Sequence, residues 1–172
     1  MSARRAIRAK VVVAGVLGAA LVAAPIVAVP AFGQVTDSGV FINEVHYDND
    51  GTDAGEAIEV AAAPGTDLTG WSIVLYNGSN GASYGTLPLS GVVGATATVV
   101  ISAPGIQNGS PDGIALINAA SAVVEFLSYE GTLTATNGPA LGILSTDIGV
   151  AQASTTAAGL SLQRTGAGDT QQ

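Results

Sequence analysis

The chain has 172 residues, no cysteine and a formal net charge of −8, with 13 acidic residues against five basic ones. The absence of cysteine excludes disulfides as a source of stability. Four of the basic residues lie within the first ten positions, so the rest of the chain is strongly acidic. Such a chain should repel phosphate backbones and anionic membrane surfaces, and we expect no direct binding of nucleic acid.

The first predicted element is a secretory signal peptide in residues 1–33, with an N-terminal signal helix. Basic residues at its start precede an uncharged apolar run at residues 11–29, and small residues follow, which is the pattern of a cleaved signal. We therefore expect a secreted, extracellular protein that begins near Gln34. The alternative is a membrane-anchored protein at the cell surface, because the apolar run is long enough to span a bilayer. Pro25 and Pro30 count against a spanning helix.

After the signal we expect a polar leader at residues 34–39, one domain at residues 40–165 and a flexible tail at residues 166–172. Short runs of β-branched and aromatic residues alternate with turns rich in glycine, and no run shows a sustained helical period. This pattern predicts an all-β, immunoglobulin-like antiparallel β-sandwich. Strands are expected at residues 40–47, 56–62, 71–76, 82–89, 96–102, 114–117, 123–129 and 160–164.

The alternation of side chains within these runs predicts which face of each strand is buried. In the third run, Trp71, Ile73 and Leu75 should face the core. In the last run, Leu160 and Leu162 should point inward. Pro88 assigns the fourth strand to a sheet edge, because proline cannot donate to a ladder. Residues 130–159 carry few bulky apolar side chains and should form a long meandering connection, which is unusual in a compact domain.

The loop between the first two predicted strands holds four carboxylates. Asp48, Asp50, Asp53 and Glu56 are hard oxygen donors interspersed with glycine, which is the chemistry that Ca²⁺ requires. They form a candidate calcium site, although the spacing differs from that of an EF-hand. The alternative is a solvated acidic turn without metal. No other cofactor is expected.

No set of residues indicates catalysis. His46 is the only histidine, and the chain has no cysteine to complete a zinc site around it. Nucleophilic catalysis needs a nucleophile, a base and an orienting group in mutual reach, and no serine or threonine is marked out by its context. We therefore expect a structural role for His46 and no enzymatic activity.

Three stretches together resemble the lamin tail domain: FINEVHYDNDGTDAGEAIEV at 41–60, DLTGW at 67–71 and SPDGIALINAASAVVEFLSYEG at 110–131. More narrowly, they resemble the lamin tail domain that precedes the catalytic domain in some secreted bacterial nucleases of the endonuclease/exonuclease/phosphatase class. The resemblance implies an immunoglobulin-like module that binds, targets or positions a partner. It carries over no catalytic residue, because the nuclease domain is not part of this chain.

The predicted function is therefore that of a secreted, non-catalytic binding, targeting or positioning module whose partner is a protein or a cell-surface component. The alternative is the N-terminal accessory part of an extracellular nuclease whose catalytic domain is absent from this chain. A membrane would be a partner only if the signal segment is retained.

Overall fold

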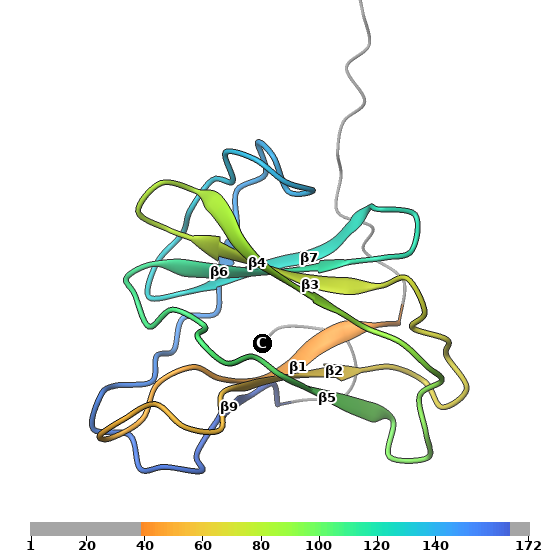
Figure 1. The fold of residues 1–172 in the computed structure, drawn as a ribbon, viewed down its shortest axis with the longest axis horizontal. Helices are drawn as coiled ribbons and strands as arrows, with labels where there is room; N and C mark the ends of the chain where they lie inside the picture. The colour runs from red at the N-terminus through yellow and green to blue at the C-terminus, as the bar shows by residue number, and fades with distance from the viewer. Residues whose placement is uncertain (1–38, 166–172) are drawn as a thin grey trace, which may run out of the picture. The chain divides into compact units, whose positions relative to one another are not determined.

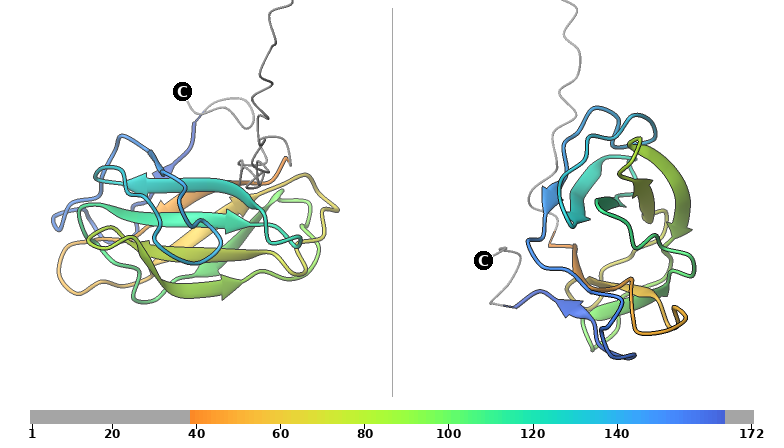
Figure 2. Two further views of the ribbon diagram at one scale, coloured as in Figure 1. Left: turned by 90° about the horizontal axis from the view of Figure 1, so that it is seen from above. Right: turned by 90° about the vertical axis from the view of Figure 1, so that its left-hand side faces the viewer.

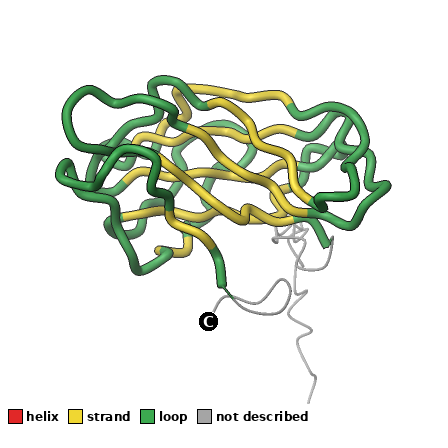
Figure 3. The backbone as a smooth tube through the Cα atoms, turned by 90° about the horizontal axis from the view of Figure 1, so that it is seen from below, coloured by secondary structure: helices red, strands yellow, loops and turns green. Residues whose placement is uncertain are grey.

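The computed structural model describes residues 39–165. The predicted signal peptide, nearly all of the predicted leader and the predicted tail lie outside these residues. The described part contains nine strands and no helix. Figure 3 shows only strands and loops in this part. Accordingly, no helix in that part is long and apolar enough to cross a membrane.

The strands form two sheets that lie one above the other (Figure 1). The four-stranded sheet has the order β5-β2-β1-β9, and the five-stranded sheet has the order β4-β3-β6-β7-β8. Neighbouring strands pair antiparallel, except that β7 and β8 are parallel. The strands are β1 (Phe41–His46), β2 (Ala57–Ala61), β3 (Ser72–Asn77), β4 (Ala82–Pro88), β5 (Thr98–Ser102), β6 (Asp112–Ile117), β7 (Val123–Tyr129), β8 (Thr146–Asp147) and β9 (Leu162–Gln163).

The prediction of an all-β fold is confirmed, and each predicted strand has a counterpart. The prediction of a purely antiparallel arrangement was wrong at one edge, because the two-residue strand β8 was not predicted and pairs parallel with β7. β1 and β2 form one antiparallel hairpin, and β6 and β7 form another. β4 lies at a sheet edge, as Pro88 indicated. The last strand is shorter than predicted, and the inward orientation of Leu160 was wrong, because that side chain is 57% exposed and precedes β9.

The main core lies between the two sheets, where apolar side chains from both sheets meet. Ile42, Val45, Ile58 and Val60 come from the four-stranded sheet, and Ile73, Leu75, Ile114, Leu116 and Leu127 come from the five-stranded sheet. The predicted core positions in β3 are thus buried, while Trp71 packs against the core and stays partly exposed. Each such side chain contributes about 1.5–3 kcal/mol when fully buried.

A second core covers the outer face of the five-stranded sheet. Its strand residues include Val74, Tyr76 and Phe126, which alternate with the residues of the main core. Residues 131–145, which we call the cover segment, supply the apolar side chains that bury this face: Leu133, Ala135, Ala140 and Ile143. The cover segment is the light blue loop above β4 and β6 in Figure 1. Part of the predicted meandering connection is therefore a packed layer, and β6 is buried at all six positions.

The remainder of that connection crosses from one sheet to the other. Residues 148–161, which we call the crossing segment, join β8 in the five-stranded sheet to β9 in the four-stranded sheet. Figure 2 (right) shows this blue chain descending along one side of the domain. β8 and β9 are both edge strands, so the crossing segment lies at the side where the two sheets are open.

Candidate functional site

The loop between β1 and β2, residues 48–56, is organised by Asn49. This side chain is 2% exposed. Its Oδ1 accepts a hydrogen bond from the Ala54 nitrogen at 3.0 Å, and its Nδ2 donates to the carbonyl oxygens of Asp50 and Thr52 at 3.0 and 3.2 Å. An asparagine that bonds nearby main-chain groups in this way holds a loop in one conformation. The loop therefore has an internal hydrogen-bonded scaffold centred on Asn49.

The four carboxylates of this loop have different surroundings. Asp48 is buried, Asp50 and Asp53 are exposed, and Glu56 is half-buried. Asp53 Oδ2 accepts a hydrogen bond from Asn108 Nδ2 at 2.9 Å, and Glu56 Oε2 accepts one from the Gly105 nitrogen at 2.7 Å.

Within residues 39–165, no group of three or more His, Asp or Glu side chains is arranged to hold a metal ion. As they stand, the four loop carboxylates do not fit the six to eight converging oxygens of a calcium site. The calcium site stays a prediction from the sequence.

His46 lies buried beside this loop, with both ring nitrogens bonded inside the protein. Nδ1 lies 3.1 Å from Gln152 Nε2, and Nε2 lies 3.2 Å from the Ala54 carbonyl oxygen. Because the amide nitrogen can only donate and the carbonyl can only accept, these partners require the neutral imidazole with its proton on Nε2. His46 thus ties β1 to the loop and to the crossing segment, which is a structural role.

Gln152, in the crossing segment, is the centre of a buried hydrogen-bond network. It is 3% exposed. Its Oε1 accepts from the nitrogens of Tyr47 and Asp48 at 2.7 and 3.3 Å, and its Nε2 donates to the Leu160 carbonyl at 2.8 Å as well as to His46. Its main-chain nitrogen donates to the Tyr47 hydroxyl at 2.7 Å. Gln152 thus ties the crossing segment to the end of β1, beside the bond from the Asp50 nitrogen to the Thr156 carbonyl oxygen at 2.7 Å.

Two stacked tyrosines extend this network into the core. The rings of Tyr47 and Tyr129 are nearly parallel, at 16°, with centroids 3.9 Å apart. The Tyr47 hydroxyl donates to Glu130 Oε1 at 3.1 Å, and the Tyr129 hydroxyl donates to the Gln107 carbonyl. Burial raises the pKa of both phenols, so both stay protonated at neutral pH.

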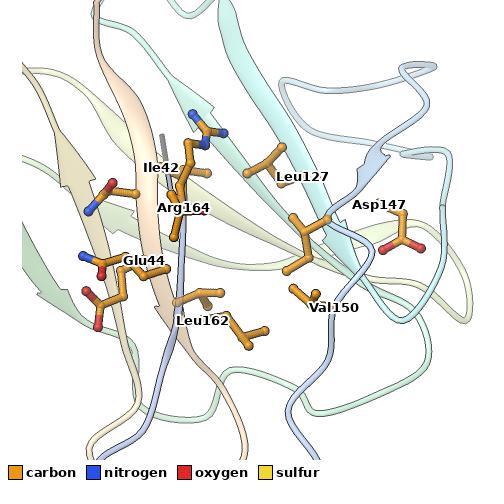
Figure 4. Close-up of a pocket in the computed structure, with 12 residues that line it drawn as sticks. Ile42, Glu44, Leu127, Asp147, Val150, Leu162 and Arg164 are labelled. Atoms are coloured by element: carbon orange, nitrogen blue, oxygen red, sulfur yellow. The ribbon is translucent and has the colours of Figure 1, made fainter. Parts of the chain in front are cut away.

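A pocket of about 490 Å³ opens at the side of the domain where the edge strands β8 and β9 lie, and we call it the edge pocket. Ile42, Leu127, Val150 and Leu162 give it apolar walls, as Figure 4 shows. Glu44 and Asp147 lie on opposite sides of it. Its lining residues are Ile42, Asn43, Glu44, Val45, Leu127, Asp147, Ile148, Val150, Leu162, Gln163, Arg164 and Thr165.

Arg164 is the only basic residue after Lys10 in the sequence, and it lines this pocket. Its side chain is 10% exposed, its Nη2 donates to Glu125 Oε1 at 2.9 Å, and its guanidinium lies 5.0 Å from the centre of the Phe41 ring. Its Nη1 is buried and has no hydrogen-bond partner among residues 39–165. Glu125 Oε2 also accepts from the Ile42 nitrogen at 2.7 Å. Glu125 on β7 thus bonds both β1 and the chain after β9, across the gap between the sheets.

No protein-family model, curated protein or solved structure matches the chain. The resemblance to the lamin tail domain therefore rests on the three sequence stretches alone. The edge pocket and Gln152 were not predicted from the sequence. Their residues come from distant parts of the chain and carry no local motif.

Proposed function

We propose that the chain is a secreted, non-catalytic, lamin-tail-like β-sandwich of the immunoglobulin type that binds a protein or cell-surface component through the edge pocket. The observation that supports this proposal is the pocket itself, with apolar walls from Ile42, Leu127, Val150 and Leu162 at the open side of the domain. A concave apolar surface with a few polar groups around it is the usual form of a binding site. Val150 is 56% exposed, so its apolar surface is available to a partner.

The charge of the chain indicates what the partner should carry. Residues 34–172 contain all 13 acidic residues and only Arg164 as a base, and Arg164 is already paired with Glu125. Glu44 and Asp147 line the pocket. A partner with an aliphatic or aromatic side chain flanked by lysine or arginine would fill the walls and meet these carboxylates. Opposite charges would also speed its association at low salt.

Selection from a random peptide library displayed on phage tests this proposal. Wild-type protein should enrich peptides with an apolar residue between basic ones. Val150→Arg places a bulky cation at the pocket and should weaken binding of those peptides at least about tenfold, the equivalent of about 1.4 kcal/mol. Val100→Arg is the matched control, because Val100 is a 66% exposed valine on β5, the strand at the far edge of the four-stranded sheet.

Two outcomes would count against the proposal: no enrichment of basic and apolar peptides, or equal loss of binding in both variants. Without such enrichment, the proposed chemistry of the partner would be wrong. With equal loss in both variants, the edge pocket would not be the binding site. Higher salt should weaken binding, because exposed charges are screened.

The alternative, suggested by the same sequence resemblance, is that the chain is the accessory part of an extracellular nuclease and positions its catalytic domain. The two proposals agree that this chain alone does not hydrolyse DNA or RNA with or without a divalent metal. A metal-dependent nuclease activity that copurifies with the protein and disappears in His46→Ala would contradict both. An in-frame nuclease domain encoded beyond Gln172 would favour the alternative.

A further inference from the structure

The chain contains four Asn-Gly pairs, which differ in whether the main-chain nitrogen of the glycine donates a hydrogen bond. In such a pair the main-chain nitrogen of glycine can attack the side-chain amide carbon of asparagine, since glycine has no side chain to obstruct the approach. A nitrogen whose hydrogen is already donated to an acceptor must first break that bond and leave its fixed orientation. The pairs are Asn77-Gly78, Asn80-Gly81, Asn108-Gly109 and Asn137-Gly138.

In three of the pairs the glycine nitrogen is held. Asp112 holds two of them, because its Oδ1 accepts from the Gly78 nitrogen at 2.9 Å and its Oδ2 from the Gly109 nitrogen at 2.8 Å. The Gly81 nitrogen donates to the Asn77 carbonyl oxygen at 2.7 Å. These bonds keep each nucleophile pointing away from its neighbouring asparagine side chain.

The fourth pair, Asn137-Gly138, lies in the cover segment and is different. The Gly138 nitrogen donates to no acceptor among the described residues. Asn137 is exposed, and its Oδ1 accepts a hydrogen bond from the Ser83 nitrogen at 2.7 Å. A donor at this oxygen polarises the amide and stabilises the oxyanion that forms when its carbon is attacked. Asn77 and Asn80 receive similar donors at their Oδ1, from the nitrogens of Ser79 and Ala82 at 2.8 Å each. What sets Asn137-Gly138 apart is that the activated amide is next to a glycine nitrogen without an acceptor in the described part of the chain.

Glycine is also required at this position for a structural reason. Gly138 has a φ of +66°, and a Cβ there would lie 2.7 Å from the Tyr76 hydroxyl oxygen. The reactive dipeptide is therefore fixed by the packing of the cover segment on β3.

We propose that Asn137-Gly138 is a site of spontaneous self-modification. The Gly138 nitrogen loses its proton and forms a bond to Cγ of Asn137, the bond from Cγ to Nδ2 breaks, and the amide nitrogen leaves as ammonia with that proton. The product is a cyclic succinimide. Water then opens the ring at either carbonyl, giving aspartate or isoaspartate at position 137, with no oxidant, reductant or cofactor.

The two products affect the cover segment differently. Aspartate keeps an oxygen for the Ser83 nitrogen and adds a negative charge. Isoaspartate inserts a methylene into the main chain, and this shifts Gly138 against Tyr76 and strains the bond from the Ala140 nitrogen to the Tyr76 hydroxyl, which is 3.0 Å long. Conversion to isoaspartate should therefore loosen the second core, of which Tyr76 and Ala140 are part.

Peptide mapping by mass spectrometry of the full chain, incubated at mildly alkaline pH, measures conversion at all four pairs at once. In the folded protein, Asn137 should convert about tenfold or more faster than Asn77 and Asn108, whose glycine nitrogens are bonded to a carboxylate. The difference in rate between Asn137 and Asn80 should be smaller, because the Gly81 nitrogen is bonded to a neutral carbonyl oxygen. In urea-unfolded chain the four rates should fall within a few fold of one another.

Asp112→Ala provides the variant test, since it releases the nitrogens of Gly78 and Gly109 together. Conversion at Asn77 and Asn108 should rise while that at Asn137 is unchanged. The proposal is overturned if another pair converts fastest in folded wild-type protein, or if the ranking is the same in folded and unfolded chain. That comparison needs no variant, so it decides the matter even if Asp112→Ala does not fold.

Discussion

Removing the side chain of Gln152 tests whether the crossing segment is held by one buried amide. Gln152→Ala deletes the bonds to the nitrogens of Tyr47 and Asp48, to His46 Nδ1 and to the Leu160 carbonyl. Each buried group left without a partner costs about 1–3 kcal/mol, less where water takes the vacated place. The bond to the Asp48 nitrogen is long, at 3.3 Å, and contributes least. We expect the free energy of unfolding to fall by about 2–4 kcal/mol.

Gln163→Ala is the matched control, because Gln163 is exposed and its side chain forms no hydrogen bond within the described part of the chain. Exposed substitutions of this kind usually change stability by less than about 0.5 kcal/mol. Equilibrium unfolding in urea, monitored by circular dichroism, measures both variants against wild type. If Gln152→Ala were as stable as Gln163→Ala, the proposed anchoring role of the amide would be refuted.

Three further predictions follow from other parts of the molecule. Gly78→Ala should lower the free energy of unfolding by about 3 kcal/mol, because a Cβ there would lie 1.7 Å from the Pro111 carbonyl oxygen. In the control Gly94→Ala, the added Cβ has no neighbour within 4 Å, so this variant should be neutral or stabilising. Equal stability of the two variants in urea would contradict this prediction. Burial raises the pKa of all four tyrosines above the ordinary value of 10.0, to about 12 for Tyr84. The folded state therefore holds phenolic protons more tightly than the unfolded state does. The free energy of unfolding should be unaffected by this difference below pH 10 and should fall as the pH rises toward 12. Urea unfolding at several pH values measures this fall. If the acidic loop binds Ca²⁺, calorimetric melting should show a gain in the free energy of unfolding of about 2.7 kcal/mol at a calcium concentration a hundredfold above Kd, and a smaller gain in Asp50→Asn. Equal melting temperatures in calcium and in chelator would show that the loop is not a calcium site.

The strands could be predicted because their signal is local. Runs such as Phe41–His46 and Val123–Tyr129 combine β-branched and aromatic residues and end at turn residues, so their existence follows from short stretches of sequence. The alternation in β3 also identified Ile73 and Leu75 as core residues. What alternation could not show was that the opposite face is buried too, because the cover segment that packs there has few bulky side chains.

The edge pocket and the Gln152 network could not be predicted for a different reason. Gln152 bonds Tyr47 from 105 positions away, and the pocket combines residues of β1, β7, β9 and the crossing segment. Such convergence depends on the path of the chain between sheets, which no local pattern encodes. The acidic loop shows the converse, because its carboxylates are conspicuous in the sequence, yet their surroundings in the fold range from the buried Asp48 to the exposed Asp50.

The most direct test of the binding proposal is a titration of isotope-labelled protein with a basic and apolar peptide from the selection, followed by amide chemical shifts. Shifts should concentrate on the residues that line the edge pocket in β1, β9 and the start of the crossing segment, with Val150 and Leu162 among the most affected. Shifts confined to the acidic loop or to the outer face of β3 and β4, or no shifts at concentrations where the displayed peptide binds, would contradict the account.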